Sequence, residues 1–202
     1  IEKGVGKKTS ETLKREDPVF KRVYNFIIGD NLRALEAAKR RAEALGLKSL
    51  ILTSADQGEA RDAARNYVSL LLDLAQSKKQ AARLFCLLAG GELTVTVRGK
   101  GKGGRNQEFV LAALQEMKNR FEGISDWLIL SLGSDGIDGQ TDAAGAWAGP
   151  STLSRAERLS LDPQKYLDDN DSYNFFKQAG GLIITGPTRT NVMDLRFFLL
   201  SI

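Results

Sequence analysis

Short apolar runs alternate with stretches of helical periodicity along most of the 202-residue chain, and this alternation restricts the fold more than any other feature. Apolar or alternating runs predict strands over residues 23–28, 49–53, 84–88, 93–97, 127–132 and 181–185. Apolar stripes at helical spacing predict helices over residues 32–45, 60–74 and 109–117, and a polar helical stretch follows residue 149. We therefore expect an α/β fold, a layered αβα domain whose largely parallel or mixed sheet is covered on both faces. Neither a helix nor a strand is predicted for the mostly apolar segment 192–200.

Composition excludes several kinds of site. The chain contains no histidine, which rules out a Ser/His/Asp triad, a Cys/His dyad or an imidazole metal site built from this chain alone. Its single cysteine, Cys86, lies in an apolar run, which predicts a buried, unreactive thiol and fits a reducing cytosol. The longest apolar runs are far shorter than the roughly 20 residues that span a bilayer, so we expect no membrane segment and a cytoplasmic protein.

Positive charge is concentrated near the start of the chain. The net charge is +4, and residues 1–50 hold 12 Lys/Arg against 7 Asp/Glu. We predict a basic linker or interdomain segment over residues 1–22 and an α/β domain over residues 23–202. The basic residues of the first segment have no aromatic residues among them, so no nucleic-acid partner is expected.

A glycine-rich basic loop, residues 98–108, lies between a predicted strand and a predicted helix. Its glycines allow backbone N–H groups to converge, and a helix N-terminus adds partial positive charge, so the loop suits a phosphate or carboxylate. The residues predicted to act on that group are Lys100, Gly101, Lys102, Gly103, Gly104, Arg105 and Asn106. The alternative is a flexible, solvated connection, since the loop lacks the order of a Walker motif.

An acidic loop, residues 133–142, follows the strongest strand candidate. Asp135 and Asp138 could hold Mg²⁺ through one or two oxygens while substrate phosphates supply the rest. A simple Asp/Gly turn is equally compatible with this pattern.

A third polar loop follows the predicted strand 181–185. Its hydroxyl and amide groups suit a small acidic or hydroxylated substrate, and a Gly-Pro turn is the alternative. The residues concerned are Thr185, Thr188, Thr190 and Asn191. Two shorter motifs, Gly29-Asp30-Asn31 and Gly90-Gly91-Glu92, read in isolation as a helix cap and a turn.

Taken together, five ordered motifs resemble the glycerate 2-kinase family, and specifically its C-terminal half with the leucine-rich module. They are GGE at 90–92, GKGKGGRNQE at 99–108, GSDGIDGQTDAAG at 133–145, NDSYNFF at 170–176 and TGPTRTNV at 185–192. The resemblance implies transfer of the γ-phosphoryl of ATP to the 2-hydroxyl of D-glycerate with Mg²⁺. It implies that Arg105, Lys100 and Lys102 act on the phosphoryl group or the glycerate carboxylate, and that Glu92, Asp135 or Asp138 lies near the metal.

The same resemblance extends to Gly29, Asp30 and Asn31, which join the glycine loop as expected nucleotide or phosphate contacts, and to an N-terminal domain that supplies a catalytic lysine. This chain is therefore expected to be inactive by itself, with that domain and glycerate as its partners and homo-oligomerisation left open. The family usually has a small residue, often glycine, at the position of Arg189. Two other functions are kept: a non-catalytic anion-binding or regulatory module, and hydroxypyruvate reductase, an older name in the family. The latter lacks support, because no dinucleotide fingerprint is visible.

Overall fold

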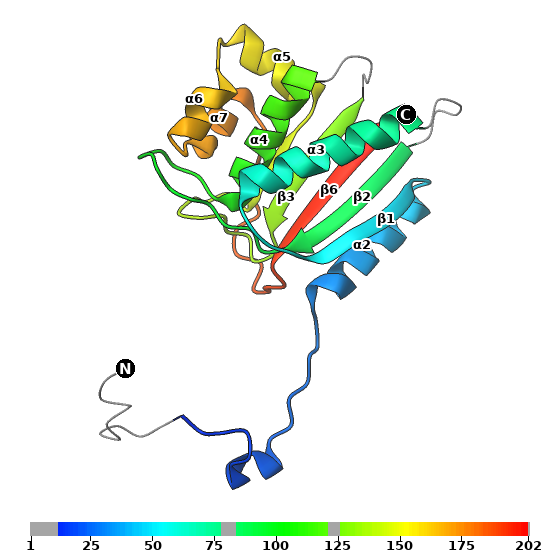
Figure 1. The fold of residues 1–202 in the computed structure, drawn as a ribbon, viewed down its shortest axis with the longest axis vertical. Coiled ribbons are helices and arrows are strands. Elements are labelled where there is room, and N and C mark those ends of the chain that lie inside the picture. The colour runs from blue at the N-terminus through cyan, green and yellow to red at the C-terminus, as the bar shows by residue number, and fades with distance from the viewer. Residues whose placement is uncertain (1–11, 78–83, 121–125, 202) are drawn as a thin grey trace.

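The computed structural model describes residues 12–77, 84–120 and 126–201, and it shows one mixed sheet with helices on both sides (Figure 1). The helices are η1 (Pro18–Arg22), α2 (Asn31–Ala44), α3 (Ala60–Ser77), α4 (Arg105–Arg120), α5 (Pro150–Arg158), α6 (Pro163–Asp168) and α7 (Ser172–Ala179). The strands are β1 (Lys48–Asp56), β2 (Leu84–Gly91), β3 (Trp127–Gly133), β4 (Gly145–Ala148), β5 (Leu182–Ile183) and β6 (Asp194–Ser201). The predicted helices, and the predicted strands within β1, β2 and β3, are confirmed.

The sheet has the order β1-β2-β6-β3-β4-β5 and is mixed, as one of the two predicted arrangements required. The alternative of a largely parallel sheet is wrong, because among the described strands only β1 and β2 pair in parallel and the other four pairings are antiparallel. The cause is β6, which comes from the unassigned segment and runs between β2 and β3 in the opposite direction. Both of its faces carry apolar side chains, as expected for a strand in the middle of a covered sheet.

Alternate side chains of the central strands enter two separate cores, since successive residues of a strand point to opposite faces. On one face Leu87 and Phe198 pack with α3 and α4, which cross in front of the sheet in Figure 1. On the other face Leu35 of α2 packs on Cys86 and Leu88. Cys86 is 3% exposed, so the predicted buried cysteine is confirmed, and burial raises the pKa of its thiol to about 11, which disfavours the reactive thiolate.

Two predicted strands are wrong. Residues 23–28 are extended but pair with no strand among the described residues, and their apolar side chains are exposed. Residues 93–97 form only a single bridge, between Thr94 and Glu59, although Leu93 and Val95 pack against the main core. Both segments have strand-like side chains, but in the part of the chain that the structure describes neither meets a strand edge that could complete a ladder.

Smaller differences concern the loops and the first residues. The segment 133–149, which the sequence predicts as a Gly/Asp-rich loop, contains the short strand β4, and the predicted strand 181–185 shrinks to the two residues of β5. Of the predicted basic linker, residues 1–11 lie outside the described residues, and the remainder contains η1. No helix within the described ranges combines the length and apolar character needed to cross a membrane.

Candidate functional site

A cleft of about 850 Å³ opens at the end of the sheet where β2 stops and β6 starts. One wall is the extended segment 92–97, and the floor is the glycine loop with the first turn of α4. Gly139, Gln140 and Asn170 complete the lining. The structure thus brings together six of the residues predicted from the sequence: Glu92, Gly101, Lys102, Gly103, Gly104 and Arg105.

Arg105, the first residue of α4, is bound by Asp194 along one edge of its guanidinium. Its Nε and Nη2 donate to the two carboxylate oxygens of Asp194 at 2.7 and 2.9 Å. Its Nη2 also lies 3.3 Å from Glu92, whose side chain is exposed. The hydrogen bonds that Arg105 donates to Asp194 raise the pKa of Arg105. The side chain is 29% exposed, so a fixed, permanently charged guanidinium borders the cleft.

Behind Arg105, a buried charge network continues into the sheet. Asp194 also accepts from Arg196 at 3.3 Å, and both side chains are fully buried. Arg196 donates to Asp56 at 3.2 Å and lies over the ring of Phe109. Burial lowers the pKa of Arg196, while its two carboxylate neighbours oppose that shift. The carboxylate that orients Arg105 is thus itself fixed from the core.

The glycine loop is held by the segment before α7, which differs from the expected anion cradle. The backbone N–H groups of Arg98 and Gly99 donate to Asn170, and those of Lys100 and Lys102 donate to Asp169 and Asp171, at 2.8–3.0 Å. The glycines are needed for this close approach, since a Cβ on Gly101 would lie 2.3 Å from Asp171. Within the described residues, the N–H groups of Gly103, Gly104 and Arg105 have no hydrogen-bond partner and remain for a ligand.

Asp138 does not fit the metal ligand that the sequence predicted. It is fully buried, and its carboxylate accepts from the backbone N–H groups of Asn106 and Gln107 at 3.0 and 2.9 Å. The same oxygens accept from both amide side chains. Burial raises the pKa of Asp138, and these four hydrogen bonds oppose the shift. Asp138 therefore caps α4, and Asn106 belongs to this cap instead of to a phosphate site.

The other predicted metal residues are separate from one another. No three carboxylate or cysteine side chains gather at a metal-binding distance in the described ranges. Glu92 could serve as a Mg²⁺ ligand, because its exposed carboxylate lines the cleft and, among the described residues, pairs with Arg105 alone. Asp135 is half-buried, and one of its oxygens accepts from Ile137 N at 3.1 Å. A single carboxylate is sufficient for Mg²⁺ when substrate phosphates supply most other ligands.

The predicted substrate loop lies beside the cleft but does not line it. Thr188 accepts from Thr190 N, and its hydroxyl and backbone N–H donate to the carbonyls of Ser134 and Asp135. Thr185 donates to the carbonyl of Gly186, and Asn191 accepts from Met193 N, so these polar groups largely hold the loop itself. Arg189 in this loop has φ +62°, the left-handed conformation that glycine adopts most easily, so the glycine expected here from the resemblance would fit this backbone without strain.

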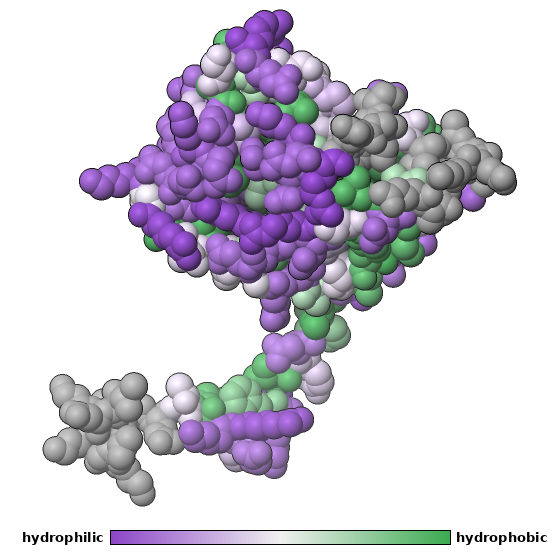
Figure 2. Space-filling model, turned by 45° about the horizontal axis from the view of Figure 1, so that its top comes forward, coloured by the Kyte–Doolittle hydropathy of each residue, from purple (hydrophilic) through white to green (hydrophobic). Residues whose placement is uncertain are grey.

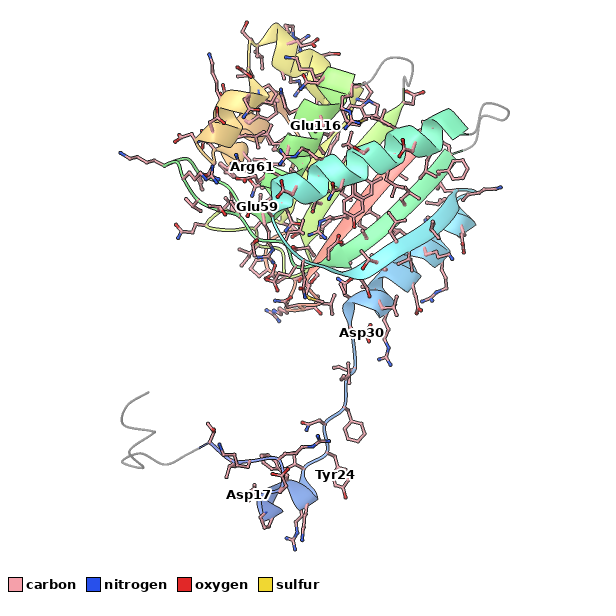
Figure 3. All side chains as sticks on the ribbon, in the orientation of Figure 1. Asp17, Tyr24, Asp30, Glu59, Arg61 and Glu116 are labelled. Carbon is pink, nitrogen blue, oxygen red and sulfur yellow. The ribbon has the colours of Figure 1, made fainter. Side chains whose placement is uncertain are left out.

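The motif at the start of α2 is a cap and an anchor. Asp30, which Figure 3 labels, accepts from Arg33 N at 2.8 Å and so caps the helix. The buried side chain of Asn31 donates to the carbonyls of Val192 and Asp194. These contacts favour a cap and an anchor over the nucleotide contact that was also predicted for Gly29, Asp30 and Asn31.

The two loop lysines differ in their surroundings. Lys102 borders the cleft, and its Nζ lies 4.2 Å from the centre of the Tyr173 ring, which holds the side chain in place. The Tyr173 hydroxyl donates to Asp142 and lowers the pKa of that carboxyl group. Lys100 is exposed and does not line the cleft.

Sequence reasoning missed the residues that hold the site from behind. Asp194 and Arg196 lie on the same face of β6. Glu108 pairs with Arg61 at 2.7 Å beneath the cleft wall. Figure 3 labels Arg61 next to Glu59 at the start of α3. A signal was present: charged residues at alternate positions of an otherwise apolar run, Asp194 and Arg196, indicate a buried pair.

The chain is similar in sequence and in structure to known proteins. The chain is 39% identical over 196 residues to glycerate 2-kinase of Pyrococcus horikoshii, covering 96% of this chain and 43% of that protein. It is 41% identical over 170 residues to a putative hydroxypyruvate reductase of Agrobacterium vitis, covering 83% and 38%. The crystal structure of glycerate kinase from Thermotoga maritima superposes with a TM-score of 0.80 and 39% identity, over 87% of this chain and 41% of that chain.

The chain thus spans less than half the length of these relatives. The sequence model described as the MOFRL family matches residues 85–194, which contain the glycine loop, the acidic loop and the start of β6. This match covers more than half of the chain, and the chain therefore belongs to the MOFRL family.

Proposed function

We propose that this chain is part of a kinase that transfers the γ-phosphoryl group of ATP to the 2-hydroxyl of D-glycerate, giving 2-phosphoglycerate. Its similarity to glycerate kinases supports the substrate class. The observation that carries the proposal is Arg105: one edge of its guanidinium is bound to Asp194, and the side chain borders an open cleft. A guanidinium fixed before the ligand arrives suits a reaction that depends on positioning and charge neutralisation.

In this proposal Arg105 contacts the transferring phosphoryl group or the glycerate carboxylate through its unbound nitrogen, Nη1. The N–H groups of Gly103 and Gly104 face the same cleft and supply further donors. Lys102 adds charge at the rim, and Lys100 adds it at longer range. Thr190, whose hydroxyl makes no hydrogen bond with other described residues, is the member of the third loop best placed to meet substrate.

The charges around the cleft indicate what else the reaction needs. Among the described residues at this end of the sheet, the carboxylates of Asp56, Glu92 and Asp194 face only two guanidiniums, those of Arg105 and Arg196. Lys102 brings this set to neutrality, which is too little positive charge to attract a nucleoside triphosphate strongly. Mg²⁺ bound to Glu92 and the nucleotide phosphates would supply part of the missing charge.

A cationic group from the remaining half of the relatives' polypeptide would supply the rest. We therefore propose that this chain is inactive alone and that the complete enzyme works in the cytosol on a small acid, without a nucleic-acid partner. Hydride transfer is not favoured, since the loop between β1 and α3, Gln57-Gly58-Glu59, lacks the glycine pattern of a dinucleotide site.

The test is coupled-assay phosphorylation of D-glycerate by ATP and Mg²⁺. It compares this chain with a chimera in which the part of the Pyrococcus horikoshii glycerate 2-kinase that precedes its matched region is fused before Ile1. We expect turnover only in the chimera, and a loss of roughly 10²–10³-fold in Arg105→Lys, because lysine cannot keep both the Asp194 contact and a ligand contact. The matched control is Arg98→Lys, an exposed arginine in the same loop that does not line the cleft.

Two results would contradict the proposal. Full activity of the Arg105→Lys chimera would remove the assigned role of this residue. A chimera that fails to turn over glycerate, in combination with a melting temperature of this chain that rises when ADP and Mg²⁺ are added together, would favour the non-catalytic anion-binding module.

A further inference from the structure

Residues 23–28 stand away from the folded body with their apolar side chains in solvent. Tyr24 is 79% exposed, Phe26 81% and Ile28 93%. Figure 2 shows hydrophobic side chains along the segment that leads from the body to η1, and Figure 3 labels Tyr24 on it, far from the sheet. Such a concentration of exposed large apolar groups indicates a surface that is covered in the complete protein.

The backbone of this segment makes almost no hydrogen bonds with other described residues. It is extended, and among the described residues the backbone groups of 24–28 make one hydrogen bond, from Arg33 Nη1 to the carbonyl of Ile27 at 3.1 Å. Its sequence, VYNFII, is rich in β-branched and aromatic residues and contains no charge, glycine or proline. This composition strongly favours pairing with another strand, and the free N–H and C=O groups are available for it.

The segment leaves the domain at a fixed point beside the cleft. Asn31 anchors the start of α2 to the carbonyls of Val192 and Asp194, and Asp194 is the residue that orients Arg105. Asp30 caps the helix immediately before it. Whatever binds residues 23–28 is therefore held close to the open side of the cleft.

The lengths of the relatives point to the occupant. The match to the Pyrococcus horikoshii enzyme covers 96% of this chain, so its unmatched ends are too short to exclude residues 23–28. The same match covers 43% of that enzyme, so more than half of its polypeptide has no counterpart here. We propose that residues 23–28 form a β-strand in a sheet of that additional part, and so fasten it over the cleft.

This inference moves the predicted domain boundary from before Val23 to Gly29, and it does not depend on which reaction the cleft performs. It is tested by hydrogen–deuterium exchange on this chain and on the chimera described above. In the chain alone, we expect the amides of residues 23–28 to exchange at the rate of an unstructured peptide. In the chimera they should exchange at least about tenfold more slowly, every second amide if the strand lies at an edge and all of them if it is central.

A pair of substitutions separates strand pairing from general stability. Phe26→Asp should leave the melting temperature of the chain alone unchanged, and it should abolish the protection of residues 23–28 in the chimera. Leu45→Asp is the matched control, because Leu45 is 61% exposed at the end of α2 and should leave that protection intact.

Two outcomes would overturn the inference. The first is unprotected amides at residues 23–28 in a folded chimera, or at the aligned residues of the intact Pyrococcus horikoshii enzyme, a measurement that requires no chimera. The second is protection in the chain alone that rises with protein concentration together with a dimer mass, which would make a second copy of this chain the occupant.

Discussion

Replacing Asp194 by asparagine should destabilise the fold far more than a surface charge change. The side chain is fully buried and accepts from Arg105, Asn106 and Arg196. Asparagine has the same shape, but it removes the negative charge and turns an NH₂ group toward donors. Arg196, also fully buried, then keeps only Asp56, at 3.2 Å. Removing one partner of a buried ion pair costs about 3–5 kcal/mol.

The assay is urea unfolding of this chain at 25 °C, followed by circular dichroism. A loss of about 3–5 kcal/mol corresponds to a fall in melting temperature of about 6–20 °C for a domain of this size. Glu92→Gln is the control: its side chain is 57% exposed and lies 3.3 Å from Arg105, so it should cost less than about 1 kcal/mol.

A double substitution then tests the cause. If the cost of Asp194→Asn arises from an unpaired buried arginine, Arg196→Met in the same chain should recover part of it, since an apolar side chain needs no counter-charge. A loss below about 1 kcal/mol for Asp194→Asn, or no recovery in the double variant, would refute the view that this carboxylate holds the network together.

Three further changes probe other parts of the fold. Arg189→Gly should stabilise the chain by about 0.5–1 kcal/mol, while Arg189→Ala should not, because the gain comes from the left-handed backbone; urea unfolding measures both. Asp138→Ala should cost about 2 kcal/mol or more and Asp30→Ala about 0.5–1 kcal/mol by the same method, since only the former cap is buried. Burial raises the pKa of the Cys86 thiol from 9.0 to about 11, so the protonated thiol should contribute roughly 2–3 kcal/mol to the free energy of unfolding. That contribution should be complete below pH 9 and lost by pH 11, and the unfolding of Cys86→Ala should lack this pH dependence.

Local pattern was sufficient for most of the long elements but not for β6 or for the arrangement of the sheet. The periodicity predicts the helices α3 and α4 and the strands β1, β2 and β3 with bounds that differ from the observed ones by a few residues. The place of β6 does not, because its ladders join Leu199 to Cys86 and to Leu128, residues far away in the sequence. An apolar run indicates that a strand is buried on both faces, but it does not predict which strands lie beside it or in which direction it runs.

The same limit applies to the site. The sequence identified Arg105 and the glycine loop, because cations and glycines before a helix are recognisable locally. It did not indicate that the backbone N–H groups of residues 98–102 donate to the segment 169–171. Asp194 was missed because it lies 89 residues from the arginine that it orients.

This arrangement links the stability of the core to the readiness of the cleft. Arg105 is oriented by Asp194, whose own position is set by β6, by Asn106 in α4 and by the buried Arg196. Its geometry is therefore established on folding, before any ligand binds, and little conformational entropy remains to be lost when a phosphoryl or carboxylate group enters. In the proposed enzyme, the described residues would supply this preorganised part of the site, and the exposed residues 23–28 would pair with a strand of the additional part. Catalysis would then require only that the additional part be brought to a cleft that is already in place.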